Sequence, residues 1–253
     1  MKADWSPLRQ ELRQWRAENR ALPIWWRDDD AISTTPALTA LSDMSLQLNV
    51  PVHLAIIPSL ADDTLAQVVA QQRNLIPMIH GWAHQNHAKP GQKKAEFDAA
   101  RTAARDEMRN GLDILSAKFQ DRLLPIFVPP WNRIDDSFHP DLAAVGYIGI
   151  STFTARKTPQ PAPGLRQINT HLDPIDWRGT RGLIDADRII HTLLDILRAR
   201  RSSAQDATEP LGYLTHHLVH DADIWQFSKA LLGELTDGGA QPVNLHTLQK
   251  DLP

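Results

Sequence analysis

The sequence contains no cysteine, no long apolar run and no concentration of basic residues. Without cysteine there is no disulfide framework, no thiolate zinc site and no thiol nucleophile, which leaves His, Asp and Glu as possible metal ligands. A transmembrane helix is not expected, because no stretch of about 18 apolar residues occurs. Lys and Arg are scattered along a chain of net charge −3, so neither a nucleic-acid partner nor an anionic membrane surface is expected.

The N-terminal segment is charged and has the apolar spacing of a helix rather than a secretion signal. We expect an amphipathic helix over residues 5–19 that packs outside the core. If residue 1 is the natural start, the segment favours a cytoplasmic protein. A chain of 253 residues with 42% hydrophobic content is expected to form one domain, residues 1–253, with residues 1–20 as a flanking helix.

Short apolar segments alternate with helical segments along the chain. Strands are predicted at 23–26, 51–58, 75–79, 123–128, 146–150, 165–169, 211–215 and 242–245. Helices are predicted at 36–48, 61–72, 92–120, 136–145, 184–201 and 222–236, with a helical turn at the end. This alternation predicts a largely parallel sheet, and seven or eight such units at this length predict a closed or nearly closed barrel.

Polar clusters follow the predicted strands. They are Asp28-Asp29-Asp30, His80 to His87, Pro129 to Arg133, Asp173 with Asp176, and His216. Because the carboxyl ends of parallel strands meet on one face of a barrel, these clusters are expected on the face where barrel enzymes keep their sites.

The three adjacent acids allow two interpretations, a solvated acidic turn or a cation site. His80 and His84 have the four-residue spacing that lets both imidazoles reach one metal ion, although eleven histidines make a chance pair easy to find. With Asp30 as third ligand they would form an open site of the hydrolytic type, in which Asp29 accepts the proton of a metal-bound water. His87 is the alternative third ligand.

The opposite side of the predicted barrel offers a proton donor. His216 could protonate a leaving group, and Asp173 or Asp176 could orient a cationic partner.

Taken in order, five motifs resemble those of the polysaccharide deacetylases, the NodB-homology or carbohydrate esterase 4 family, over roughly residues 22–250. The motifs are Asp29-Asp30, His80-x-x-x-His84, Pro130-Trp131, Asp173-x-x-Asp176-Trp177 and Leu214-x-His216. The resemblance implies an α/β fold, a distorted (β/α)7-8 barrel of NodB type with parallel strands and outer helices, in a divergent member. It also implies removal of acetyl groups from N-acetylated sugars with one divalent metal ion, usually zinc.

Residue roles follow from the same resemblance. It implies Asp29 as general base, His216 as general acid, and Asp30, His80 and His84 as metal ligands. The backbone N–H of Trp131 would help to hold the oxyanion. We assign the substrate and oxyanion surroundings to Pro130, Trp131, Asn132 and Trp82, and supporting roles to Asp173, Asp176 and Trp177.

The chain departs from the family pattern at several positions. Gly81 and Gln85 replace the Ser or Thr and the Pro that usually follow the two histidines. Phe127 stands where we place the arginine that pairs with the catalytic base, so Arg27, Arg133 or Arg178 would have to supply a guanidinium. The extra Asp28 leaves open a second register in which Asp28 and Asp29 form the pair, and Ala31 favours the pair Asp29-Asp30.

Other histidines and tryptophans are assigned from position alone. His217 should point away from His216 and be packed or hydrogen-bonded, because alternate strand residues face opposite ways. His171 is expected to be a surface histidine, and no role is assigned to His220. Four tryptophans inside or beside the motifs predict an aromatic-walled pocket: Trp26, Trp82, Trp131 and Trp177.

The predicted function is a metal-dependent hydrolase that removes an acetyl or acyl group from an N-acetylated sugar or a related small amide. Its partner would be a small molecule or a glycan. Two alternatives remain open: a catalytically degenerate barrel that binds metal or carbohydrate, and a structural barrel whose histidines serve packing. The sequence does not specify oligomeric state.

Overall fold

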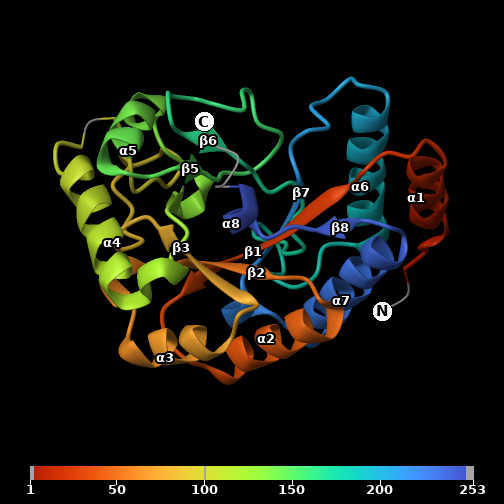
Figure 1. The fold of residues 1–253 in the computed structure, drawn as a ribbon, viewed down its shortest axis with the longest axis horizontal. Helices are drawn as coiled ribbons and strands as arrows, with labels where there is room; N and C mark the ends of the chain where they lie inside the picture. The colour runs from red at the N-terminus through yellow and green to blue at the C-terminus, as the bar shows by residue number, and fades with distance from the viewer. Residues whose placement is uncertain (1–2, 100, 249–253) are drawn as a thin grey trace.

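A parallel, strongly curled sheet forms the centre of the protein (Figure 1). The computed structural model describes residues 3–99 and 101–248. Eight strands pair in the order β6-β5-β4-β3-β2-β1-β7, with β8 also on β1. Their bounds are β1 Pro23–Ala31, β2 Val52–Ile56, β3 Leu75–His80, β4 Ile126–Val128, β5 Gly149–Ile150, β6 Arg166–Gln167, β7 Leu211–Thr215 and β8 Gln241–Pro242.

The sheet curls until the segment after β6 meets β7. Leu172 forms a parallel bridge with Tyr213, and His171 N–H donates to the carbonyl of Gly212 at 2.8 Å. These contacts bring the two ends of the strand order together. The distorted parallel barrel expected from the alternating pattern is therefore confirmed.

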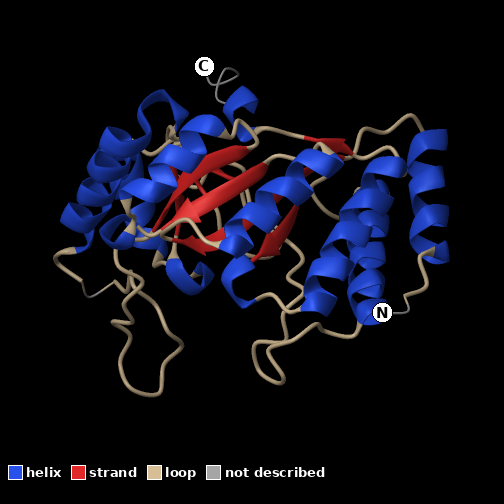
Figure 2. Ribbon diagram, turned by 90° about the horizontal axis from the view of Figure 1, so that it is seen from below, coloured by secondary structure: helices blue, strands red, loops and turns tan. Residues whose placement is uncertain are grey.

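Helices surround the sheet (Figure 2). Their bounds are α1 Ser6–Ala17, α2 Pro36–Leu48, α3 Asp63–Gln71, α4 Ala104–Phe119, α5 His139–Val145, α6 Ala186–Arg201, α7 Ala222–Asp237 and α8 Leu245–Leu248. The predicted N-terminal helix is confirmed, and it packs outside the barrel against α6 and α7. Arg201 on α6 forms a 2.7 Å ion pair with Glu11 on this N-terminal helix. In the described part of the chain no helix is long and apolar enough to cross a membrane.

Strand β1 separates two layers of hydrophobic core. Trp25 belongs to a smaller cluster with Ile76, Met78 and Leu245, which fills the barrel interior, whereas Trp26 belongs to the larger cluster between strands and helices. Successive residues of a strand point to opposite faces. Trp25, Arg27 and Asp29 therefore face the interior, and Trp26 and Asp28 face the helical layer.

The helix predicted over residues 92–120 begins only at Ala104. Residues 84–99 instead form an irregular loop, because two of its side chains are buried by distant partners. Phe97 is fully buried and its backbone bridges Ile134, and the carboxylate of Glu96 turns inward to bind backbone amides. Long-range burial thus overrides the helical pattern.

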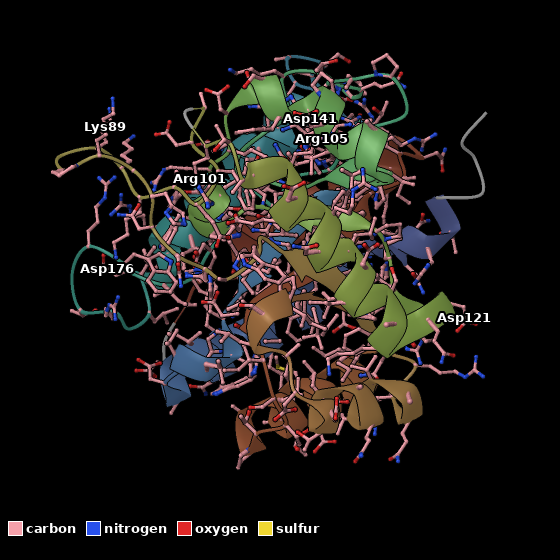
Figure 3. The ribbon with its side chains drawn as sticks, turned by 90° about the vertical axis from the view of Figure 1, so that its left-hand side faces the viewer. Lys89, Arg101, Arg105, Asp121, Asp141 and Asp176 are labelled. Atoms are coloured by element: carbon pink, nitrogen blue, oxygen red, sulfur yellow. The ribbon has the colours of Figure 1, made fainter. Side chains whose placement is uncertain are left out.

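Two loops project from the same side of the molecule, opposite α8 (Figure 3). One carries Lys89 and follows β3, and the other carries Asp176 and precedes α6. Both leave the carboxyl-terminal side of the strands, so they rise beside the polar clusters.

Candidate metal and catalytic site

Asp30, His80 and His84 come together at the ends of β1 and β3. The Oδ1 atom of Asp30 lies 3.1 Å from Nε2 of His80 and 3.3 Å from Nε2 of His84. One donor atom from each residue lies within 4.8 Å of the others, which is a geometry that one cation can span. Exposed His87 is not part of this group.

The chemistry of this donor set fits a divalent metal. His80 Nδ1 lies 2.9 Å from the carbonyl of Val128, so we place the ring proton there. Nε2 of the neutral ring then presents a lone pair to the Asp30 carboxylate, and either a proton or a metal cation between them relieves the repulsion. Two imidazole nitrogens and one carboxylate oxygen form a three-ligand set that suits zinc and leaves a position open.

The electrostatics favour the ionised carboxylate and a neutral imidazole. Burial opposes ionisation of Asp30, but the hydrogen bond from His80 and the nearby histidine charges lower its pKa. Burial and the neighbouring His80 lower the pKa of His84. Burial also acts to lower the pKa of His80, but Asp30 outweighs it and raises that pKa, so a cation competes with a proton for Nε2.

Buried Glu96 holds the loop that carries His84. Its carboxylate accepts backbone N–H bonds from Trp82, Ala83 and Gln85 at 3.0, 2.8 and 3.1 Å. A side chain at Gly81 would clash with this carboxylate and with the ring of Pro130, and Gly81 has φ +55°. The space that the usual Ser or Thr needs is therefore filled, which explains glycine there. Glu96 was missed from the sequence because its partners come from a turn over ten residues away.

Arg27 pairs with the predicted base. Its Nε lies 2.9 Å from Asp29 Oδ1, and Nη2 donates to Oδ2 at 3.1 Å. Both residues are buried, with Asp29 only 2% exposed. The guanidinium also donates to Ser151 Oγ at 2.7 Å and to Asn132 Oδ1 at 2.5 Å. Of the three arginines considered from the sequence, this one makes the contact.

Position 127 could not have supplied that arginine. Phe127 packs edge-to-face against Phe97 and Tyr147, with ring centroids 5.0 and 5.2 Å apart, in the layer between strands and helices. Its neighbour Val128 belongs to the interior cluster. A side chain at 127 therefore points away from Asp29.

Asp28 lies on the opposite side of β1 from Asp29. Its carboxylate accepts hydrogen bonds from Thr215 Oγ1 at 2.6 Å and from His217 N–H at 3.0 Å, and it pairs with His217 Nδ1 at 2.5 Å. Burial opposes its ionisation, but His217 lowers the pKa of Asp28. Asp28 therefore fixes the turn after β7, and the structure places His217 as the packed, hydrogen-bonded histidine expected.

His216 stands at the end of β7, beside Trp177 and Asp173. The rings of His216 and Trp177 meet edge-to-face, with centroids 4.7 Å apart. Asp173 orients that tryptophan by accepting a 2.8 Å hydrogen bond from its Nε1. Burial raises the pKa of Asp173, and the charge of His216 opposes the rise. His216 is also close enough for its charge to lower the pKa of Asp30. His220 Nε2 accepts a 3.3 Å hydrogen bond from His216 N–H.

Other predicted residues have mainly structural contacts. The carboxylate of Asp176 accepts hydrogen bonds from the amides of Gly179 and Thr180, which closes the projecting loop. Asn132 gives its amide oxygen to Arg27, and Trp82 packs against the large core cluster.

Two expectations were wrong. His171 is buried rather than on the surface: its Nδ1 accepts a hydrogen bond from Gly212 N–H, which leaves the ring proton on Nε2 to donate to Glu209 at 3.2 Å. Trp26 is fully buried and donates to Thr215, so it cannot line a pocket.

Left-handed backbone conformations gather at the site. Asp30, His84, Trp131 and Asn132 have φ angles of 71°, 56°, 55° and 57°. Such angles are uncommon outside glycine and cost energy that the surrounding structure must offset. Trp131 presents its ring to His84, with centroids 4.4 Å apart.

Several solved structures are similar to this chain. A proposed polysaccharide deacetylase from Mycobacterium smegmatis is 14% identical over 91% of this chain and 89% of its own, with a TM-score of 0.62. A family 4 acetyl xylan esterase from Clostridium thermocellum, in complex with a cobalt ion, is 14% identical over 91% of this chain and 93% of its own, with a TM-score of 0.55. A CE4 family pseudoenzyme from Bacillus anthracis is 12% identical over 87% of this chain and 63% of its own, with a TM-score of 0.54.

No family model and no curated protein matches the sequence. At identities this low the likeness establishes the fold. The resemblance expected from the five motifs is thereby confirmed at the level of the barrel.

Proposed function

We propose that this chain, which has the fold of the polysaccharide deacetylases, is a metal-dependent hydrolase that removes an acetyl or acyl group from an N-acetylated sugar or a related small amide. The observation that carries the proposal is the group of Asp30, His80 and His84, with Asp29 next to Asp30 in the chain and His216 at the end of the neighbouring strand β7. Structural neighbours that act on glycans support this chemistry, and Zn²⁺ is the ion that best suits the donor set.

Asp30, His80 and His84 would hold the ion. When bound, it lowers the pKa of water and polarises the carbonyl oxygen of the amide. Asp29 accepts the proton of the attacking water, and Arg27 keeps that carboxylate oriented through two guanidinium nitrogens.

His216 then donates a proton to the leaving amine nitrogen. Its buried Nδ1 atom has no hydrogen-bond partner among the residues that the structure describes. The N–H of Trp131, whose backbone is held in a left-handed conformation, stabilises the developing oxyanion.

Metal analysis combined with an acetate-release screen of N-acetylated compounds tests this function. We expect one zinc ion per chain and turnover of at least one compound. Asp29→Asn and His216→Asn should each abolish turnover while the metal content stays unchanged. Turnover retained in both variants would show that the catalytic roles are wrong.

A catalytically degenerate metal- or carbohydrate-binding barrel is the second candidate, since a pseudoenzyme has this fold. Stoichiometric zinc without hydrolysis of any compound would favour it. Absence of bound zinc would favour a structural barrel instead. The single domain and the cytoplasmic location stay predictions.

A further inference from the structure

Two tryptophans flank the site, and each carries a cation on its ring. Trp131 contacts His84, and Nζ of Lys94 lies 5.7 Å from the centroid of the Trp131 ring. Trp177 contacts His216, and the guanidinium carbon of Arg181 lies 5.7 Å from the Trp177 ring. A neutral sugar would stack on an open aromatic face, whereas here a positive charge covers part of each ring.

The backbone holds both cations in place. The carbonyl of Lys94 accepts a 3.0 Å hydrogen bond from Arg133, and the next residue, Ala95, accepts one from His87 N–H. Arg181 has a left-handed φ of 61°, and its N–H donates to the carbonyl of Asp176. Both cations therefore stand on hydrogen-bonded stretches of the two projecting loops, which Figure 3 marks by Lys89 and Asp176.

Neither cation is neutralised within the described part of the chain. Lys94 and Arg181 are exposed, and neither forms an ion pair with another residue that the structure describes. The neighbouring carboxylates are already engaged: Glu96 and Asp176 bind backbone amides, and Asp173 binds Trp177 and a backbone amide. The chain as a whole has a net charge of −3, so positive charge beside the site is a local feature.

We propose that the substrate is an anionic N-acylated sugar or small amide, whose phosphate or carboxylate group is bound by Lys94 and Arg181. This inference rests on the proposed function, because it assumes that the acyl group reaches the site between Asp29 and His216. Fixed cations beside a reacting centre attract an anionic substrate and set its register.

Matched compounds test the charge preference. The probes are N-acetylglucosamine, its 6-phosphate, and N-acetylmuramic acid, which carries a carboxylate. We expect kcat/KM for at least one anionic probe to exceed that of the neutral sugar by about tenfold or more, since one charged contact is worth roughly that factor. The better of the two anionic probes identifies phosphate or carboxylate as the group recognised.

Surface substitutions then test the two residues. Lys94→Gln and Arg181→Gln should each raise KM for the preferred anionic probe about tenfold with kcat retained, and should leave the neutral sugar unaffected. Lys94→Arg should restore most of the affinity. Lys89→Gln removes the same charge from the tip of the same loop and should change nothing. Equal kcat/KM for neutral and anionic probes would overturn the inference and leave the deacetylase function intact.

Binding provides a readout that does not need turnover. The anionic probe should bind the metal-loaded Asp29→Asn variant in calorimetry, and adding Lys94→Gln should weaken that binding by the same factor. If no compound is hydrolysed but this binding pattern appears, the hydrolase function fails and the anion site stands. Failure of every anionic probe to bind overturns the inference.

Discussion

Replacing Arg27 by methionine is the sharpest test of how the site is built. The substitution keeps an unbranched, flexible side chain and removes the guanidinium that contacts Asp29, Ser151 and Asn132. Asp29 would be left 2% exposed beside a thioether, without the guanidinium that now pairs with it.

Breaking a buried charge pair by removing one partner costs roughly 3–5 kcal/mol, because the remaining charge stays desolvated. For a chain of this size each kcal/mol lowers the melting temperature by about 2–4 °C. Arg27→Met should therefore lower the midpoint of thermal unfolding by about 6 °C or more. In the double variant Arg27→Met/Asp29→Asn no unpaired carboxylate remains. Its loss of unfolding free energy should therefore be smaller, by about 2 kcal/mol or more, than the sum of the losses in the two single variants.

Urea unfolding of the metal-free protein at neutral pH measures the unfolding free energy of the unsubstituted protein, the two single variants and the double variant. Arg9→Met is the matched control, because it removes the same atoms from an exposed pair with Glu234 and should shift the midpoint far less. A loss below about 1 kcal/mol for Arg27→Met, or additive losses in the double variant, would refute the reasoning. Turnover should also fall in Arg27→Met, since Asp29 loses its orienting partner.

Three further changes have defined outcomes. Zinc at about 100 times its dissociation constant should stabilise the protein by about 2.7 kcal/mol, and Asp30→Ala should remove that stabilisation. If calorimetry shows that zinc stabilises Asp30→Ala as much as the unsubstituted protein, Asp30 is not a ligand. Glu96→Ala should weaken zinc binding about 10- to 100-fold by freeing the loop that carries His84, and Glu96→Gln, which keeps one acceptor, should weaken it less; unchanged affinity in competition titrations would contradict this role. Burial lowers the pKa of His53 in the folded protein to about 3, so below about pH 6.5 the unfolded state binds one more proton than the folded state. Between about pH 6.5 and about pH 3, the free energy of unfolding should therefore fall by about 1.4 kcal/mol per pH unit more steeply than in His53→Gln. Identical pH slopes of the two proteins in urea unfolding would rule out this linkage.

Much of the fold could be predicted because parallel strands buried on both faces appear as short, nearly continuous apolar runs. The helix prediction failed over residues 92–99 and 101–103, where the composition favours a helix. There Phe97 is drawn into the core and Glu96 binds the amides of the preceding turn. Helical spacing cannot reveal such contacts, because their partners come from other elements.

Part of the candidate site could also be predicted from the sequence, and part could not. The spacing of His80 and His84 predicted them as candidate metal ligands, and position after a predicted strand added Asp30 and His216. His171 gave no signal, since Arg200 and Glu209 reach it only in the folded barrel. A signal did exist for Arg27: it precedes Asp29 by two residues on a strand, which places both on one face and favours it over the other arginines.

Strand geometry explains why three adjacent acids are tolerated. Asp28 and Asp29 lie on opposite faces of β1, where His217 and Arg27 neutralise them separately. Strict alternation would send Asp30 to the helical layer with Asp28. Instead the register of β1 against β2 shifts between Asp28 and Ala31, and Asp30 has a φ of 71°. Bulges of this kind re-aim a side chain near active sites. The irregularity turns the third acid toward His80 and His84, so three carboxylates one residue apart face three different partners rather than one another.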